Sequence, residues 1–99
     1  MKLVKLLREH KEYVFADQLL RSATSIGANV CDEAGAGQNK KDFIAKMAIA
    51  SKEARETGYW LRLIEKGKII RADMKPYLNE IEQIIKILTK IVKTSQQNL

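Results

Sequence analysis

One segment decides the fold: NKKDFIAKMAIASKEARETGYWLRLIEKG, residues 39–67. It contains no proline, and Gly58 is the one glycine inside it. Its apolar residues recur at steps of three, four or seven, which is the spacing of one face of an α-helix. These residues are Phe43, Met47, Ala50, Ala54, Leu61 and Ile64. The segment therefore predicts a long helix from Asn39 to about Gly67 with one buried face.

The segment before it predicts a second long helix, from Val14 to about Ala34. Its buried stripe follows the same spacing and is widened by neighbouring small or apolar residues. The stripe is Phe15, Leu19, Ala23, Ile26 and Val30, and the widening residues are Ala16, Leu20 and Gly27. Gly35 and Gly37 predict the end of this helix, and Asn39 is a favourable N-cap for the next one.

The two ends of the chain predict one short and one long helix. Residues 2–9 place Leu3, Leu6 and Leu7 on one face of a short helix, and residues 10–13 are expected to form a connection. Asp73 can cap a last helix that runs to about Thr94, beyond which fraying is expected. The apolar positions of this last helix are the most regular in the chain: Tyr77, Leu78, Ile81, Ile84, Ile85, Leu88, Ile91 and Val92.

The composition indicates one folded domain, residues 1–99. The hydrophobic content is 45% and the charged content 30%, which is typical of a globular protein. Five glycines and one proline leave little turn chemistry, so helices with short connections are favoured over strands. Short connections make neighbouring helices antiparallel. We therefore predict an all-α fold, an up-and-down four-helix bundle with a short first helix.

The sequence favours a cytoplasmic protein without a membrane span. Cys31 is the one cysteine, so it cannot form an intrachain disulfide and is expected to be a small buried residue. The first residues, MKLVKLLREHKEY, are charged throughout and do not have the pattern of a signal peptide. No run approaches the roughly 18 to 20 apolar residues that cross a bilayer.

The charge balance favours an anionic partner. With 18 basic and 12 acidic residues the formal net charge is +6, as in many proteins that bind nucleic acid. The candidate binding residues form a stripe on the outer side of the third helix: Lys52, Arg55, Tyr59, Arg62 and Lys66. Its cations can follow a phosphate backbone, and Tyr59 can stack on an unpaired base. The alternative is an ordinary solvated helix face, and Lys86, Lys90 and Lys93 on the last helix are less informative still.

Polar residues also lie beside the buried stripe of the second helix. Ser22, Ser25 and Asn29 recur at steps of three and four, although serine and asparagine are indifferent helix formers. We predict that they form an inter-helix polar cluster with Glu56, which would fix the register of the second and third helices. The alternative is a ligand or active-site role for these residues.

Two segments resemble a known family. They are LLRSATSIGANVCDEAGAG, residues 19–37, and KDFIAKMAIASKEARETGYWLRLI, residues 41–64. Together they resemble the four-helix bundle proteins encoded in 23S rRNA intervening sequences, a family similar to the accessory variability protein of diversity-generating retroelements. The residues that carry the resemblance are Arg21, Ser22, Ser25, Ile26, Asn29, Glu33, Phe43, Ser51, Glu53, Glu56, Thr57, Tyr59, Trp60 and Leu61. The first helix is shorter than expected for the family.

The resemblance implies an assembly and partners. It implies an up-and-down bundle that forms a homopentamer around a central channel. In the retroelement relatives it implies binding to a reverse transcriptase and to nucleic acid, whereas most members have no assigned activity. Trp60 lies at the edge of the apolar face and is either a lid on the core or an anchor on the next subunit. The resemblance favours the subunit interface.

No catalytic, cofactor or metal site is expected. His10 is the one histidine and Cys31 the one cysteine, so neither a zinc site nor a carboxylate–histidine metal site can be assembled. Cys31 also lacks the nearby base that a catalytic thiol needs. The sequence therefore predicts a non-enzyme: an oligomeric protein that binds RNA or DNA and/or a partner enzyme through basic helix faces. The alternative is a protein–protein scaffold that does not bind nucleic acid.

Overall fold

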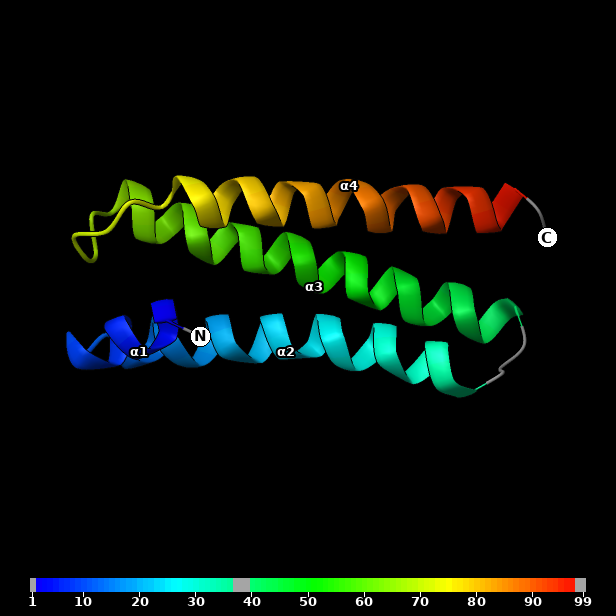
Figure 1. Ribbon diagram of the computed structural model, residues 1–99, viewed down its shortest axis with the longest axis horizontal. Coiled ribbons are helices and arrows are strands. Elements are labelled where there is room, and N and C mark those ends of the chain that lie inside the picture. The colour runs from blue at the N-terminus through cyan, green and yellow to red at the C-terminus, as the bar shows by residue number, and fades with distance from the viewer. Residues whose placement is uncertain (1, 37–39, 98–99) are drawn as a thin grey trace.

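Four α-helices make up the computed structural model. It describes residues 2–36 and 40–97, and the side chains of all of these except residues 32–36. The helices are α1 (Lys2–Glu9), α2 (Tyr13–Ala36), α3 (Lys40–Lys66) and α4 (Lys75–Gln97). They run alternately up and down the long axis of the molecule (Figure 1). The prediction of an all-α four-helix bundle with a short first helix is confirmed.

Two predicted helix ends are wrong by a few residues. Helix α2 continues through Gly35 to Ala36, because one glycine costs a helix only about 1 kcal/mol and does not have to end it. Helix α4 continues past Thr94 to Gln97, since glutamine is a good helix former. The predicted cap of α4 is confirmed: the backbone N–H of Lys75 donates to Asp73 Oδ1 at 3.1 Å. The predicted N-cap Asn39 lies outside the described residues.

A lysine in the left-handed conformation ends both α1 and α3. The φ angles are 60° at Lys11 and 49° at Lys68. After α3, the N–H of Ile69 donates to the carbonyl of Ile64 at 3.1 Å, and that of Lys68 to Glu65 at 3.2 Å. This is the Schellman pattern of helix ends, which also follows α1. Glycine usually occupies the left-handed position, because a side chain there is strained.

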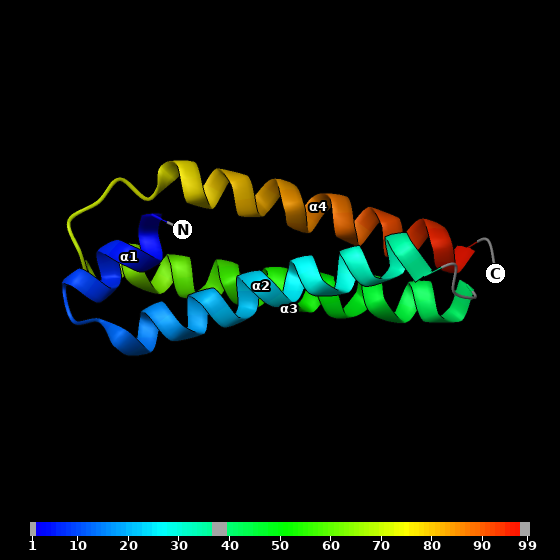
Figure 2. The same cartoon turned by 60° about the horizontal axis from the view of Figure 1, so that its bottom comes forward.

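Helix α3 is the centre of the bundle. Helix α2 packs along one side of it and α4 along the other, and α1 packs on α2. Within the described residues, α2 and α4 do not approach within 8 Å between Cα atoms. Helix α1 lies between them at the end where the α3–α4 connection turns (Figures 1 and 2). The fourth position of the bundle is therefore filled only at that end.

The buried core is concentrated at the end that holds α1. The side chains of Leu3, Leu7, Leu19 and Ile64 are at most 1% exposed there. The α3–α4 connection adds Ile70 and Met74, which are also buried. The sequence does not identify these two residues as core, because they follow no helical period.

The apolar face of α4 is less buried than its regular pattern predicts. Only Ile81 and Leu88 are buried, and Ile84, Ile85, Ile91 and Val92 are half-buried. The neighbouring Ile87 is 59% exposed. On α2, Leu20 and Gly27 are exposed, so the prediction that they widen the buried stripe is wrong. Leu20 lies beside Val4 and Lys5 of α1, whereas Gly27 and the exposed residues of α4 lie farther along the bundle.

Candidate functional site

The basic stripe of α3 is on the surface. Its five residues, Lys52, Arg55, Tyr59, Arg62 and Lys66, are all exposed, and Tyr59 is 51% exposed. Because α-helical residues turn by about 100° each, these positions lie within roughly 80° of one another. The structure therefore presents them together as one strip of α3.

One hydrogen bond and one ion pair place this strip along the seam between α3 and α4. The Arg55 guanidinium donates to Thr89 Oγ1 at 3.3 Å. Nη1 of Arg62 lies 3.6 Å from Glu82 Oε1, and both side chains are about half exposed. Such exposed ion pairs contribute little to stability, so Arg62 can exchange Glu82 for another anion at small cost.

A small hollow in the same seam brings in Lys93 of α4, which is not singled out from the sequence. The hollow has a volume of about 230 Å³, and Arg55 and Lys93 both line it. Ser51 and Thr89 contribute hydroxyl groups, so cations and hydrogen-bond donors converge on one depression. The signal that could have identified Lys93 is its spacing of four from Thr89, which puts both residues on the side of α4 that faces α3.

The predicted inter-helix polar cluster is divided into separate contacts. The hydroxyl of Thr57 donates to Ser22 Oγ at 2.8 Å, which joins α3 to α2 inside the core. The Asn29 amide instead donates to the backbone carbonyl of Ser25, 2.8 Å away on the same helix. Ser22 thus bridges the helices, but its partner is Thr57 and not a member of the predicted cluster, whereas Asn29 bonds locally to Ser25. Thr57 carries part of the family resemblance, but the sequence does not pair it with Ser22.

Glu56 belongs to a surface ion-pair group rather than to the buried contact. Arg21 of α2 pairs with Glu56, and Nη1 of Arg21 lies 3.2 Å from Glu53 Oε2. The hydrogen bond to Glu56 raises the pKa of the Arg21 guanidinium above its ordinary value, against an opposing effect of burial. Arg21 therefore ties α2 to α3, and the prediction that Glu56 joins the serines is wrong. The charge of Arg21 instead attracts Glu56 to the surface between α2 and α3.

Comparisons with known proteins identify the family. The model of the 23S rRNA-intervening sequence protein family matches residues 1–90. The chain belongs to this family. It is also similar to the crystal structure of a protein with unknown function from the S23 ribosomal protein family of Bacteroides thetaiotaomicron. That match has 47% identity and a TM-score of 0.79, and covers 93% of this chain and 86% of the other. No curated protein matches the chain.

In this member of the 23S rRNA-intervening sequence protein family, Trp60 covers the seam between α2 and α3. Its ring packs edge-on against Phe15, with ring centres 6.0 Å apart, and against Tyr59 at 5.3 Å. Its Nε1 is buried and has no hydrogen-bond partner among the described residues. Within one chain, Trp60 is therefore a lid on the core, which is the first of the two roles expected for it.

The metal-ligating side chains of this family member are scattered over the described part of the chain. Over residues 2–36 and 40–97, where described, no three histidine, cysteine, aspartate or glutamate side chains form a group that could hold a metal ion. His10 is exposed, with Nδ1 at 2.9 Å from the carbonyl oxygen of Leu6. Cys31 is exposed, so the expectation that it is buried is wrong.

None of the helices, as far as the structure describes them, is both long enough and apolar enough to cross a membrane.

Proposed function

We propose that this protein is a non-catalytic, homo-oligomeric member of its family that binds nucleic acid through the α3–α4 seam. One observation supports this proposal most directly: Arg55 and Lys93, from different helices, line the same hollow. Two cations and two hydroxyl groups around one depression suit a phosphate group, which is an anion with several acceptor oxygens. We place the protein in the cytoplasm as part of the same proposal, since Cys31 is a free thiol.

The dimensions of the stripe also fit a nucleic-acid backbone. Lys52 and Lys66 stand at its two ends, and at 1.5 Å per residue they are about 21 Å apart along α3. This length is on the order of six steps along one strand of a duplex. Tyr59 lies between them with half of its side chain exposed, so an unpaired base can stack on it.

The charge is unevenly distributed around α3. On the side toward α2, Glu53 and Glu56 are paired with Arg21, so the two carboxylates offset the positive charge of that side. On the side toward α4, Lys52, Lys66 and Lys93 are exposed cations. A polyanion is therefore attracted to one edge of α3 rather than to the whole surface.

The test is an RNA mobility-shift titration at two salt concentrations, with the double variant Arg55→Gln and Lys93→Gln. We expect the unmodified protein to bind and to weaken steeply with salt, because binding releases counterions. Neutralising two phosphate contacts should lower the salt slope by about 2. The matched control is Lys2→Gln with Lys5→Gln, which removes the same charge from the exposed side of α1.

Two outcomes would contradict the proposal. One is the absence of binding to structured RNA, single-stranded RNA or duplex DNA even at low salt. The other is an equal loss of affinity in both double variants, which would assign binding to net charge and not to the seam. Circular dichroism melting of each variant checks that the fold is retained.

A protein–protein scaffold is the second candidate function. It is favoured by apolar side chains on the outer face of α3, where Ile49, Tyr59 and Leu63 are exposed. In this proposal the partner is the next subunit of a homopentamer, or an enzyme such as a reverse transcriptase, and Trp60 lies beside the contact. The native mass tests it: five copies of the 11.3 kDa chain support the pentamer, and a monomer contradicts it.

A further inference from the structure

The hollow in the α3–α4 seam is polar both in its deepest part and at its mouth. Ser51 of α3 is the most buried of its lining residues, with 5% of its surface exposed. Arg55, Lys93 and Gln96 also line the hollow and are exposed. A group that enters the hollow therefore passes cationic and amide donors before it reaches the Ser51 hydroxyl.

The Ser51 hydroxyl is available to such a group. A buried hydroxyl on a helix normally donates to a carbonyl about one turn earlier. In this protein Ser22 donates to the carbonyl of Leu19 at 3.3 Å, and Thr57 to that of Glu53 at 2.9 Å. No hydrogen bond joins the Ser51 hydroxyl to another residue in the part of the chain that the structure describes. Ser51 thus places a donor without a protein partner inside the hollow.

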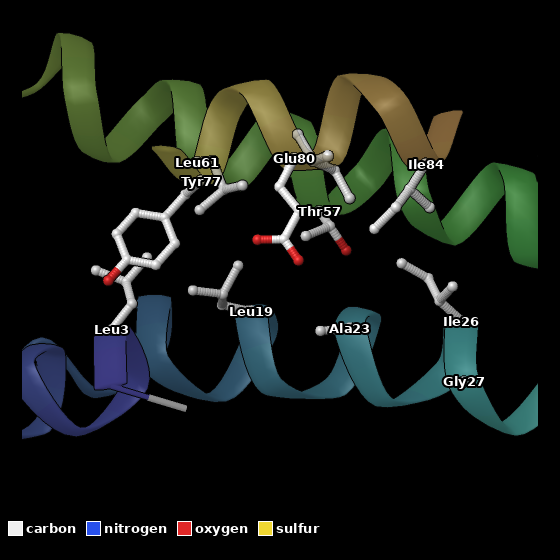
Figure 3. A pocket seen from close by; sticks show the side chains of 11 residues that line it. Leu3, Leu19, Ala23, Ile26, Gly27, Thr57, Leu61, Tyr77, Glu80 and Ile84 are labelled. Atoms are coloured by element: carbon white, nitrogen blue, oxygen red, sulfur yellow. The ribbon is translucent and has the colours of Figure 1, made fainter. Parts of the chain in front are cut away.

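The charge of the hollow selects an anion. Arg55 and Lys93 are cations, and none of the described residues that line the hollow is acidic. The cavity between α2 and α4 differs, since Figure 3 shows the Glu80 carboxylate there among mostly apolar side chains. No cation lines that cavity within the described residues. An anion is therefore attracted to the hollow of the α3–α4 seam and repelled from the cavity between α2 and α4.

Two cations distinguish the end of a nucleic-acid strand from its interior. Each phosphate within a strand is a diester with a single negative charge. A terminal phosphate is a monoester, which carries a charge of about −1.5 to −2 at pH 7 and three acceptor oxygens. The monoester matches Arg55 and Lys93 in charge, and its additional oxygen can accept from Ser51.

The size of the hollow also favours a terminal group. Its volume of about 230 Å³ is below the roughly 300 to 1,000 Å³ of pockets that enclose a whole small molecule. The hollow therefore suits one charged group, with the rest of the ligand outside it. Tyr59 follows Arg55 by one turn of α3, about 6 Å along the helix axis. The base of an unpaired end nucleotide can stack on Tyr59 at that distance.

We propose that the hollow binds the terminal phosphate monoester of a single-stranded nucleic acid, so that the protein recognises the end of a strand. This inference rests on the nucleic-acid binding proposed above and names its ligand. Arg55 and Lys93 neutralise the phosphate, and Ser51 donates to the oxygen that enters deepest. Thr89 accepts a hydrogen bond from Arg55 and holds its guanidinium at the hollow. The strand then continues along the basic stripe toward Lys66.

The experiment compares three single-stranded RNA oligonucleotides of one sequence, each labelled with fluorescein at an internal base. One has a 5′-phosphate, one a 3′-phosphate, and one has hydroxyl groups at both ends. We expect one of the phosphorylated oligonucleotides to bind at least tenfold more tightly than the hydroxyl-ended one, as measured by fluorescence anisotropy at constant ionic strength.

Ser51→Ala should weaken binding of the preferred oligonucleotide about tenfold, because it removes one hydrogen bond to a charged group. Binding of the hydroxyl-ended oligonucleotide should not change, since the basic stripe is intact. The matched control is Ser95→Ala, which removes the hydroxyl of a half-buried serine that lines a different hollow of α4. This control should keep the full preference for the phosphorylated end.

A second pair of variants tests the charge. Lys93→Gln should reduce the preference at least tenfold. Lys90→Gln removes the same charge from an exposed position of α4 that lines the other hollow, so it should leave the preference unchanged. Melting curves check that each variant is folded, which is expected because alanine and glutamine are good helix formers.

The possible failures can be told apart. Equal binding of all three oligonucleotides would overturn the recognition of strand ends and leave nucleic-acid binding intact, whereas no binding of any of them would overturn both. A preference that survives in Ser51→Ala and Lys93→Gln would place the strand end elsewhere. Inorganic phosphate is the last probe: if it competes with the hydroxyl-ended oligonucleotide as well as with the phosphorylated one, the hollow does not hold the terminal phosphate.

Discussion

The two ends of this molecule are built from the same three long helices but differ in how far they bury their apolar residues. At the end that holds α1, four helices and the α3–α4 connection enclose Leu3, Leu7, Leu19 and Ile64. At the other end, no fourth helix packs on α2, α3 and α4 in the part of the chain that the structure describes, and Ile84, Ile87 and Ile91 remain partly or mostly exposed. The difference shows that helical periodicity specifies which face is apolar, whereas burial depends on what packs against that face.

The largest expected difference in stability is between two residues of α2: Leu19, in the enclosed core, and Ile26, farther from α1. Leu19→Ala should lower the free energy of unfolding by about 3 kcal/mol, because it leaves a cavity in the enclosed core. Ile26→Ala, at a half-buried position farther along α2, should lower it by about 1 kcal/mol. Urea denaturation followed by circular dichroism measures both. Equal losses would show that the two ends are equally enclosed in solution.

Neighbouring residues of α4 sharpen the same comparison. Leu88→Ala should cost about 2 kcal/mol, because Leu88 is buried against α3. Ile87→Ala should change the free energy of unfolding by less than about 0.5 kcal/mol, since Ile87 is mostly exposed. The same denaturation experiment measures both variants. A loss at Ile87 as large as that at Leu88 would mean that something covers this face.

The hydrogen bond between Thr57 of α3 and Ser22 of α2 tests how α2 and α3 pack in the core. Thr57→Val keeps the size of the side chain but removes its hydrogen bond to Ser22, which should cost about 1 to 2 kcal/mol. Ser22→Ala in the Thr57→Val background should cost less than it does alone, because their shared bond is already lost. A double-mutant cycle of melting free energies measures this coupling. Additive losses would contradict the shared bond.

A gain in stability of less than about 1 kcal/mol is expected at the turn that attaches α1. Lys11→Gly should raise the free energy of unfolding by about 0.5 to 1 kcal/mol, because glycine adopts the left-handed conformation of Lys11 without strain. The control Lys5→Gly, within α1, should lower it by about 1 kcal/mol. Thermal melting compares the two. A loss at Lys11 would contradict the left-handed turn and with it the placement of α1.

Much of the fold follows from the sequence because it depends on local patterns. The period of the apolar residues predicts α3 to within a residue or two, and Asp73 predicts the cap of α4. Ile70 and Met74 could not be predicted, because their burial depends on how a connection folds back over the end of the bundle. The exposed side of α4 could not be predicted either, because burial depends on which elements pack against α4 and not on the apolar pattern of α4 itself.

The candidate site was predictable in part for the same reason. The stripe from Lys52 to Lys66 lies on one helix, so its spacing alone brings it together. Lys93 joins Arg55 only through the packing of α4 on α3, and Thr57 meets Ser22 only through the packing of α3 on α2. Glu56 was assigned to the wrong contact, because Arg21 on the neighbouring helix attracts it to the surface.

Native-state hydrogen exchange along α4 tests the comparison between the two ends most directly. Amide protection reports local opening, which is easiest where few apolar contacts cover a helix. The account predicts strong protection around Ile81, near the α1 end, and weaker protection from Ile87 onward. Uniform protection along α4 would contradict it, because the second half of α4 would then be covered as well as the first.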